Sequence, residues 1–179
     1  MGMLLAFLPF LVFALLERIA GPAAGLLAGT AVSGGLLLRD RLTPGRSPKL
    51  LEIGTLLLFG ALSVIMLAGA AWSVVQVRLA VDAGLLLIVL ATLAIGRPFT
   101  LQYAREQVPE AYWNSPEFHR TNVVITAAWA VAFAVLVAVE GAMVALPGFP
   151  HQLGVVVIVL ALVGAVKFTQ WYPSRSRGR

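Results

Sequence analysis

Long apolar stretches alternate with short polar ones along this chain. They predict six helices, at residues 3–20, 21–38, 53–72, 79–95, 123–146 and 153–172. Most of these helices are apolar nearly all round, as a membrane span should be, because a helix at the surface of a soluble protein keeps a polar face. We predict an all-α, polytopic membrane protein with about six transmembrane helices in one domain over residues 1–172, followed by a basic tail at 173–179.

The first apolar stretch has more than one interpretation. It runs from Met3 to Leu16, contains Pro9, and is closed by Glu17-Arg18. Fourteen residues of helix cover about 21 Å, whereas a hydrocarbon core is about 30 Å thick. The stretch fits a tilted spanning helix, a re-entrant segment or an interfacial helix. We favour a spanning helix that also uses the flanking residues.

Composition supports the membrane assignment. The chain is 60% hydrophobic and 12% charged, whereas about a quarter of the residues of a soluble domain are charged. It contains no cysteine, which excludes a disulfide framework, a thiolate metal site and a cysteine nucleophile. The net charge is +5, but the basic residues are spread over loops and tail, so we expect no nucleic-acid partner.

The basic residues predict the orientation. With six spans, all 13 Lys and Arg residues except Arg18 and Arg78 fall on one side, if Lys167 is counted there. Cytoplasmic loops collect basic residues, so both termini and the loop at 39–52 are predicted to be cytoplasmic. In that loop Ser47-Pro48 is a candidate helix start, with serine as the N-cap and proline as the first helical residue.

Small residues recur along the second predicted helix. Gly21, Gly25, Gly29 and Ser33 follow one another at four-residue spacing, which places them down one side of a helix. Such stripes favour close helix packing in lipid, where association cannot rely on hydrophobic exclusion. The stripe predicts an internal helix contact, with a homodimer face as the alternative.

Ionisable residues within apolar stretches are candidates for function. Asp82 lies about 22 Å along a helix from Arg97, inside the apolar zone, and Arg78 is one turn away from it. We interpret Arg78 and Asp82 as a structural pair, with a proton or ion site as the alternative. Glu140 is predicted to be a solvated boundary residue, and Lys167 to extend its amine to the interface.

The longest polar segment, 97–122, separates the fourth and fifth predicted helices. One interpretation is a membrane-surface helix over 98–108 with Phe99 and Tyr103 facing lipid, and a capped connector is the simpler one. A cytoplasmic docking surface is the sharper alternative, because protein interfaces favour arginine and aromatic residues. Its candidate residues are Arg97, Phe99, Tyr103, Arg105, Tyr112, Trp113, His119 and Arg120.

No pattern typical of an enzyme is present. The two histidines, His119 and His151, fall on opposite sides of the predicted topology and therefore cannot share a metal. The sequence offers no glycine-rich phosphate loop, zinc-type histidine pair or serine nucleophile motif. We predict no enzymatic activity, no catalytic or metal site and no cofactor.

In three segments the chain resembles the intracellular septation protein A family of small bacterial inner-membrane proteins. These segments are LPFLVF near the N-terminus, RPFTLQ after the fourth predicted helix, and AAWAVAF in the fifth. The spacing of the apolar stretches is also similar over most of the chain. The resemblance implies a multi-pass protein of the bacterial inner membrane that contributes to envelope upkeep and septation through contacts with envelope-building proteins.

The expected function is therefore association in the membrane. The expected partners are the lipid bilayer, other membrane or cell-envelope proteins and, through the glycine stripe, a second copy of the chain. The alternatives are a small-solute or ion transporter or channel, and an accessory subunit of a larger membrane complex. Few hydroxyl residues are available at mid-depth to line a transport path, and these can hydrogen-bond within their own helices.

Overall fold

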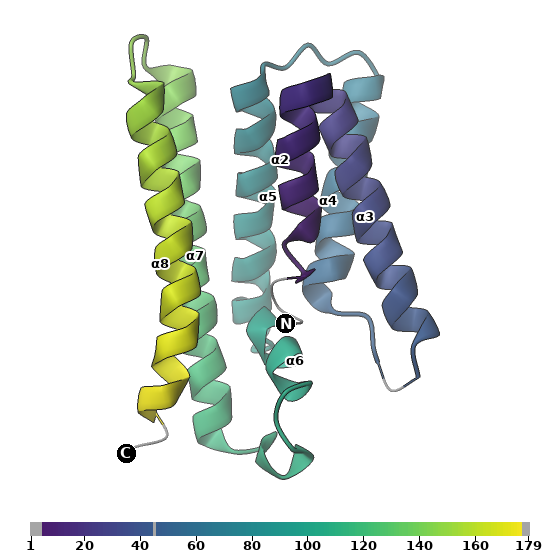
Figure 1. Ribbon diagram of the computed structural model, residues 1–179, viewed down its shortest axis with the longest axis vertical. Helices are drawn as coiled ribbons and strands as arrows, with labels where there is room; N and C mark the ends of the chain where they lie inside the picture. Colours follow the sequence, from purple (N-terminus) through teal and green to yellow (C-terminus); the bar gives the residue numbers. More distant parts are fainter. Residues whose placement is uncertain (1–4, 45, 177–179) are drawn as a thin grey trace. The chain divides into compact units, whose positions relative to one another are not determined.

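Helices form all the regular structure of the described residues, 5–44 and 46–176, in the computed structural model. This finding confirms the all-α class. In chain order the elements are α2 (Leu8–Ala20), α3 (Pro22–Leu42), α4 (Leu50–Leu67), α5 (Val74–Ala94), the short α6 (Phe99–Arg105), the 3-10 turn η1 (Glu110–Tyr112), α7 (Pro116–Ala145) and α8 (His151–Ser176) (Figure 1).

Four of the described helices, α4, α5, α7 and α8, are long and apolar enough to cross a membrane. α2 has only 13 residues, and α3, with 21, is rich in glycine and ends in Arg39-Asp40-Arg41. Large aliphatic side chains point outward from the long helices; on α8, Val155, Val159 and Leu160 are 51%, 51% and 64% exposed. Apolar side chains turned outward fit surrounding lipid better than water.

Contacts group the chain into two units, Met1–Ile88 and Val89–Arg179, and the division falls within α5. The single domain expected over 1–172 stays a prediction. In the first unit α3 packs against both α2 and α4. The side chains of its central cluster come from α2, α3, α4 and α5 and are Phe13, Leu26, Phe59, Leu62, Val77 and Val81.

Two glycines of α3 let its neighbours come close. A Cβ added at Gly25 would lie 2.9 Å from the backbone oxygen of Phe13 in α2, and one added at Gly29 would lie 2.8 Å from the Phe59 ring in α4. Real Cβ atoms almost never make contacts shorter than 3.0 Å. Both glycines therefore belong to an internal contact of the first unit and are not open to a second copy of the chain.

The other two members of the predicted stripe differ from each other. Ser33 is buried at 1% exposure in α3. Gly21 precedes the helix and serves as its N-cap, with a φ of 91° that favours glycine. Gly21 therefore allows the turn between α2 and α3, and its prediction as part of the packing face is wrong.

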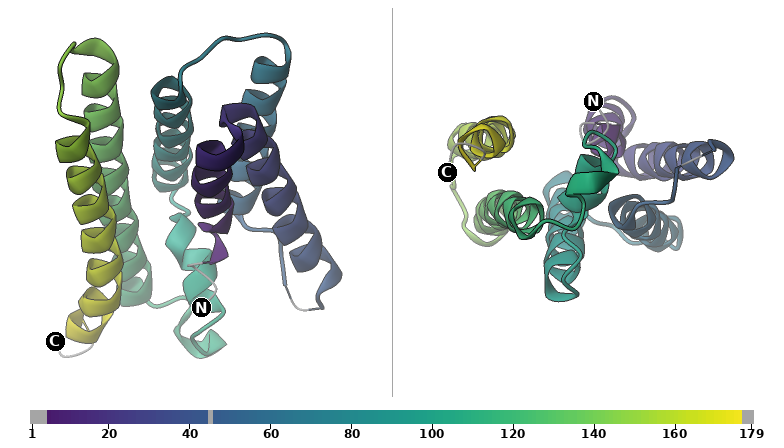
Figure 2. Two further views of the ribbon diagram at one scale, coloured as in Figure 1. Left: turned by 45° about the horizontal axis from the view of Figure 1, so that its top comes forward. Right: turned by 90° about the horizontal axis from the view of Figure 1, so that it is seen from below.

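The second unit contains a helical hairpin. α7 and α8 lie side by side in Figure 1 and in both views of Figure 2. Trp129 of α7 donates from Nε1 to Thr169 Oγ1 of α8 at 2.9 Å, and Gly154 of α8 lies against Met143 of α7. α6 packs against α7 as well, so the polar segment after α5 returns to the hairpin.

Several helix starts differ from the predicted ones. α5 begins at Val74 rather than at 79, which places Arg78 inside a helix. α7 begins at Pro116 rather than at 123, because Ser115 Oγ accepts a hydrogen bond from the Phe118 N–H and caps the helix. The predicted start at residue 3 lies outside the described residues.

The other differences concern α4 and α8. α4 covers 50–67 instead of 53–72, and its N-cap is Lys49, so the expected helix start at Ser47-Pro48 is wrong. α8 continues past 172 and through Pro173 to Ser176, into the predicted tail. The rest of that tail, 177–179, lies outside the described residues.

Candidate functional site

The polar segment between α5 and α7 is folded onto its own unit. The Phe99 N–H donates to Thr92 Oγ1 at 3.3 Å. Thr100 Oγ1 donates to the Asn122 carbonyl at 3.0 Å, and lies 2.8 Å from Thr126 Oγ1. Thr100, Asn122 and Thr126 are at most 3% exposed. These buried hydrogen bonds hold α6 against the first turns of α7.

The aromatic residues of α6 point inward. Phe99 is 0% and Tyr103 1% exposed, and their rings meet edge to face at 6.5 Å between centroids. The interpretation of this stretch as a membrane-surface helix with both rings facing lipid is wrong, because the same rings serve to pack the helix. Neither ring belongs to an exposed docking surface.

The remaining candidate docking residues lie nearer the surface. Arg97, Tyr112, His119 and Arg120 are exposed, and Tyr112 keeps 59% of its surface. The Arg105 guanidinium lies over the Trp113 ring, 5.5 Å from its centroid, where the ring face attracts the positive charge.

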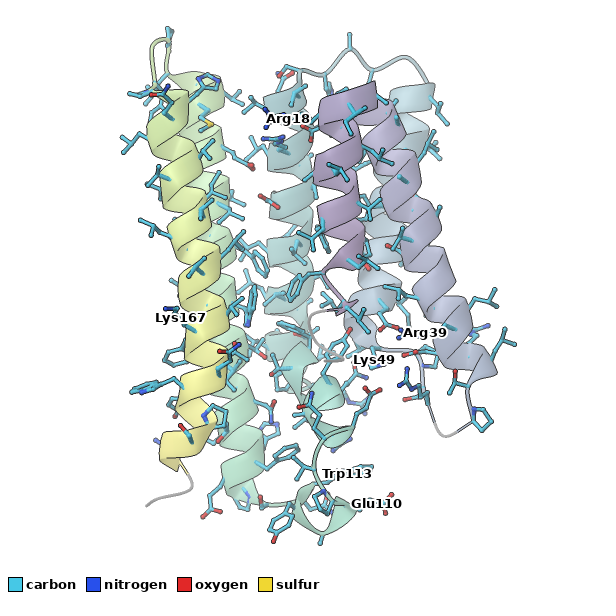
Figure 3. The ribbon with its side chains drawn as sticks, in the orientation of Figure 1. Arg18, Arg39, Lys49, Glu110, Trp113 and Lys167 are labelled. Carbon is cyan, nitrogen blue, oxygen red and sulfur yellow. The ribbon has the colours of Figure 1, made fainter. Side chains whose placement is uncertain are left out.

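Two hydrogen bonds fix the outer part of the segment. Trp113 Nε1 donates to the Val108 carbonyl at 2.9 Å, and His119 Nε2 lies 3.2 Å from the Gly96 carbonyl. Figure 3 shows Trp113 and Glu110 close together at the turn that precedes α7. The four exposed residues and the stacked pair therefore form one ordered, partly aromatic surface, which we call the 97–122 surface.

A cavity of about 730 Å³ opens beside this surface. Its walls come from the end of α6, the η1 turn, the start of α7 and the end of α8. The lining residues are Ala104, Gln107, Val108, Pro109, Tyr112, Ser115, Glu117, Phe118, Thr121, Asn122, Ile125 and Pro173. The sequence analysis missed this cavity, because Pro173 and Ile125 come together only through the hairpin.

Charged side chains in the first unit are paired inside it. Arg78 donates from Nε to both carboxylate oxygens of Glu17, at 2.9 and 3.1 Å, and its Nη2 lies 2.7 Å from Oε1. The Glu17 side chain is fully buried and that of Arg78 is 39% exposed. No sequence signal marks this pair, since 61 residues separate its members. Asp82 follows Arg78 by one turn of α5, and the pairing predicted between them stays a prediction.

A second charged cluster joins α3 to α4. The buried Asp40 carboxylate accepts hydrogen bonds from Arg39 Nη2 at 2.8 Å and from Lys49 Nζ, and Arg46 Nη1 lies 3.4 Å away. Lys49 Nζ also lies 3.6 Å from Glu52 Oε1. Figure 3 shows Arg39 and Lys49 near the loop that joins the two helices.

The cluster changes the acidity of Asp40, which lies past the apolar part of α3. Burial raises the pKa of Asp40, but hydrogen bonds and positive charge from Lys49 and Arg39 lower it by more, so its pKa lies below the ordinary value. The carboxylate is therefore held charged and clips the basic loop to α3. The sequence predicts that these basic residues share one side of the membrane, but it does not indicate that the loop closes on Asp40.

The two remaining ionisable residues differ in exposure. Lys167 is exposed on α8, and the extension of its amine to the interface stays a prediction. Glu140 is only 4% exposed, so its prediction as a solvated boundary residue is wrong. It lies on the face of α7 that also carries Phe133 and Leu136, at spacings of three and four residues, and that face is buried.

No group of three or more His, Asp or Glu among the described residues is arranged to hold a metal ion. Comparisons with family models, curated proteins and solved structures find no match to this chain.

Proposed function

We propose that this chain is a non-enzymatic protein of the bacterial inner membrane that acts by associating with other membrane or cell-envelope proteins. The observation that carries the proposal is the ordered 97–122 surface. Buried hydrogen bonds fix it to its own unit while Tyr112 stays 59% exposed. A preorganised surface with exposed aromatic and arginine side chains loses little entropy on binding a partner.

The proposed topology has six spans, with both termini and the 97–122 surface in the cytoplasm. The part of α3 before Arg39, residues 22–38, covers about 26 Å, so α3 would cross a hydrocarbon core of about 30 Å with its flanking residues near the interface. α2 would cross with the help of its flanking residues. The absence of cysteine allows a direct test with single cysteines at the exposed positions Ala20, Ser47, Glu106 and Gln152. A maleimide that cannot cross the membrane should label Ala20→Cys and Gln152→Cys in intact cells, but Ser47→Cys and Glu106→Cys only after lysis.

The hydrogen bonds of hydroxyl side chains in the long helices support association over solute transport. Thr30 Oγ1 lies 3.1 Å from Ser63 Oγ across the contact of α3 with α4. Thr55 donates to the Glu52 carbonyl and Thr92 to that of Val89, each within one helix. The contact between Thr30 and Ser63 stabilises helix packing, and the other two hydroxyl groups are engaged by the backbone of their own helices. The septation-like role implied by the sequence resemblance is part of the proposal and would place the partners in the envelope-building machinery.

Photo-crosslinking in living cells tests the association. A benzoyl-phenylalanine at Tyr112 should give a crosslink to one or a few discrete proteins, identified by mass spectrometry. The matched control is the same residue at Phe149, another aromatic position, in the turn between α7 and α8. Crosslinks to lipid alone from position 112, or the same proteins from both positions, would reject the 97–122 surface as the site of association.

A further inference from the structure

The cavity beside the 97–122 surface carries a second proposal, which does not depend on the first. We infer that it binds the headgroup of a phospholipid that bears a primary ammonium ion, as phosphatidylethanolamine does. Its volume, about 730 Å³, falls within the range of about 300–1,000 Å³ typical of small-molecule sites. The depth of the cavity, its charge and the amide of one buried asparagine support this inference.

The depth follows from the α7–α8 hairpin. Its apolar stretches end at Asn122-Val123 in α7 and at Tyr172-Pro173 in α8. About 20 helical residues cross the hydrocarbon core. Counted from the opposite end of each helix, about 20 residues end close to Val123 in α7 and to Tyr172 in α8. Trp171 and Tyr172 are the residue types that gather at membrane interfaces. Since Asn122 and Pro173 both line the cavity, it opens at the level of lipid headgroups.

The charge of the cavity is opposite to that of its surroundings. Among the lining residues the acidic one is Glu117, and none is Lys, Arg or His. The nearby basic side chains have other positions: Arg105 stacks over Trp113, and His119 Nε2 lies against the Gly96 carbonyl. A cation in the cavity therefore meets a carboxylate without a competing positive side chain on the wall.

A buried amide supplies a further acceptor. Asn122 is 3% exposed and lines the cavity. Its Nδ2 donates to the Phe118 carbonyl at 2.8 Å, so the other polar atom of the amide, Oδ1, is an acceptor. The side-chain amide oxygen can accept a hydrogen bond from a ligand or a water in the cavity.

These acceptors select among lipid headgroups. A primary ammonium carries three N–H donors, enough to serve both the Glu117 carboxylate and the Asn122 amide oxygen, whereas the trimethylammonium of phosphatidylcholine has none. An anionic headgroup such as that of phosphatidylglycerol would meet Glu117 with like charge. The apolar walls at Val108, Ile125 and Pro173 suit the glycerol and upper acyl carbons of the same lipid.

The experiment uses the full-length protein in nanodiscs. These contain equal amounts of phosphatidylethanolamine, phosphatidylcholine and phosphatidylglycerol with identical acyl chains. Lipids retained after transfer to mild detergent are counted by native mass spectrometry. The test variant is Glu117→Gln. The matched control is Glu110→Gln, which removes the same charge from an exposed residue of the same segment that does not line the cavity.

The wild-type protein should retain phosphatidylethanolamine over phosphatidylcholine by about fivefold or more. Glu117→Gln should lower that ratio by up to about fivefold, towards equal retention, as expected for the loss of one charge-assisted hydrogen bond at an exposed site, and Glu110→Gln should leave it unchanged. Equal retention of the two lipids by the wild-type protein would overturn the inference. So would equal effects of the two variants, or displacement of the retained lipid by millimolar free ethanolamine, which would indicate a site for soluble amines.

Discussion

The contact between Gly29 and Phe59 gives the sharpest test of the helix packing. Replacing Gly29 with alanine adds one methyl group to α3, and its carbon would lie 2.8 Å from two carbons of the Phe59 ring and 3.1 Å from a third. Ordinary van der Waals contacts of a Cβ lie at 3.4–4 Å. The ring or the helix must therefore move by about 1 Å.

The surroundings of Phe59 make that movement costly. Phe59 is 0% exposed, and its ring packs against Phe10 at 5.1 Å and Phe13 at 5.6 Å between centroids. Overpacking of a tight core costs about 1–3 kcal/mol, and the better helix propensity of alanine returns up to about 1 kcal/mol. We therefore expect Gly29→Ala to lower the free energy of unfolding by about 1–2 kcal/mol.

Gly35→Ala is the matched control in the same helix, because a Cβ there meets nothing within 4 Å. For a chain of this size 1 kcal/mol corresponds to about 2–4 °C in Tm. Thermal unfolding can be measured in detergent by size-exclusion chromatography of heated samples. Gly29→Ala should melt about 2–8 °C below the wild-type protein. Gly35→Ala should melt at the wild-type temperature or slightly above it.

A second substitution tests the cause. If the clash with the ring is responsible, Phe59→Leu should cost less in the Gly29→Ala background than alone, because a flexible side chain can move away from the added methyl group. Such pairs in contact couple by about 0.5–3 kcal/mol. Equal melting temperatures for the two alanine variants, or strictly additive effects of the double substitution, would refute this account of the packing.

Three further predictions concern polar contacts. Glu17→Gln should lower the free energy of unfolding by about 1–3 kcal/mol, because Arg78 loses a charged acceptor. Adding Arg78→Gln to the Glu17→Gln variant should cause little further loss in thermal melts, and fully additive losses would show that the pair is uncoupled. The pKa of Asp40 lies below its ordinary 3.8, so as the pH falls its carboxylate is protonated in the unfolded chain before it is protonated in the folded protein. The stabilisation that the charged carboxylate provides is therefore complete above about pH 4 and is lost as the pH falls through the lowered pKa. The Tm difference between the wild-type protein and Asp40→Asn should therefore shrink below pH 4, and a difference independent of pH would contradict the role given to Lys49. Ser115→Ala should cost about 0.5–2 kcal/mol and speed amide exchange in the first turn of α7, whereas unchanged exchange there would contradict the cap.

The sequence by itself determined the class of protein and the approximate number and order of its helices. Hydrophobic runs suffice for this, because the cost of placing a polar backbone or side chain in lipid is local to each segment. Helix ends were less well determined. Ser47-Pro48 and Ser115-Pro116 are the same dipeptide, and only the second begins a helix, because its serine accepts the bond from Phe118 N–H that completes the cap.

Only the tertiary structure decided which polar groups meet. Glu17 and Arg78 are 61 residues apart, and Asp40 meets Lys49 through the fold of the loop, so neither pair leaves a periodic signal in the sequence. Phe99 and Tyr103 have the spacing of an amphipathic surface helix, yet packing buries them at 0% and 1% exposure. The cavity also arises from tertiary packing. Its lining includes Ile125 and Pro173, which the antiparallel pairing of α7 and α8 brings together.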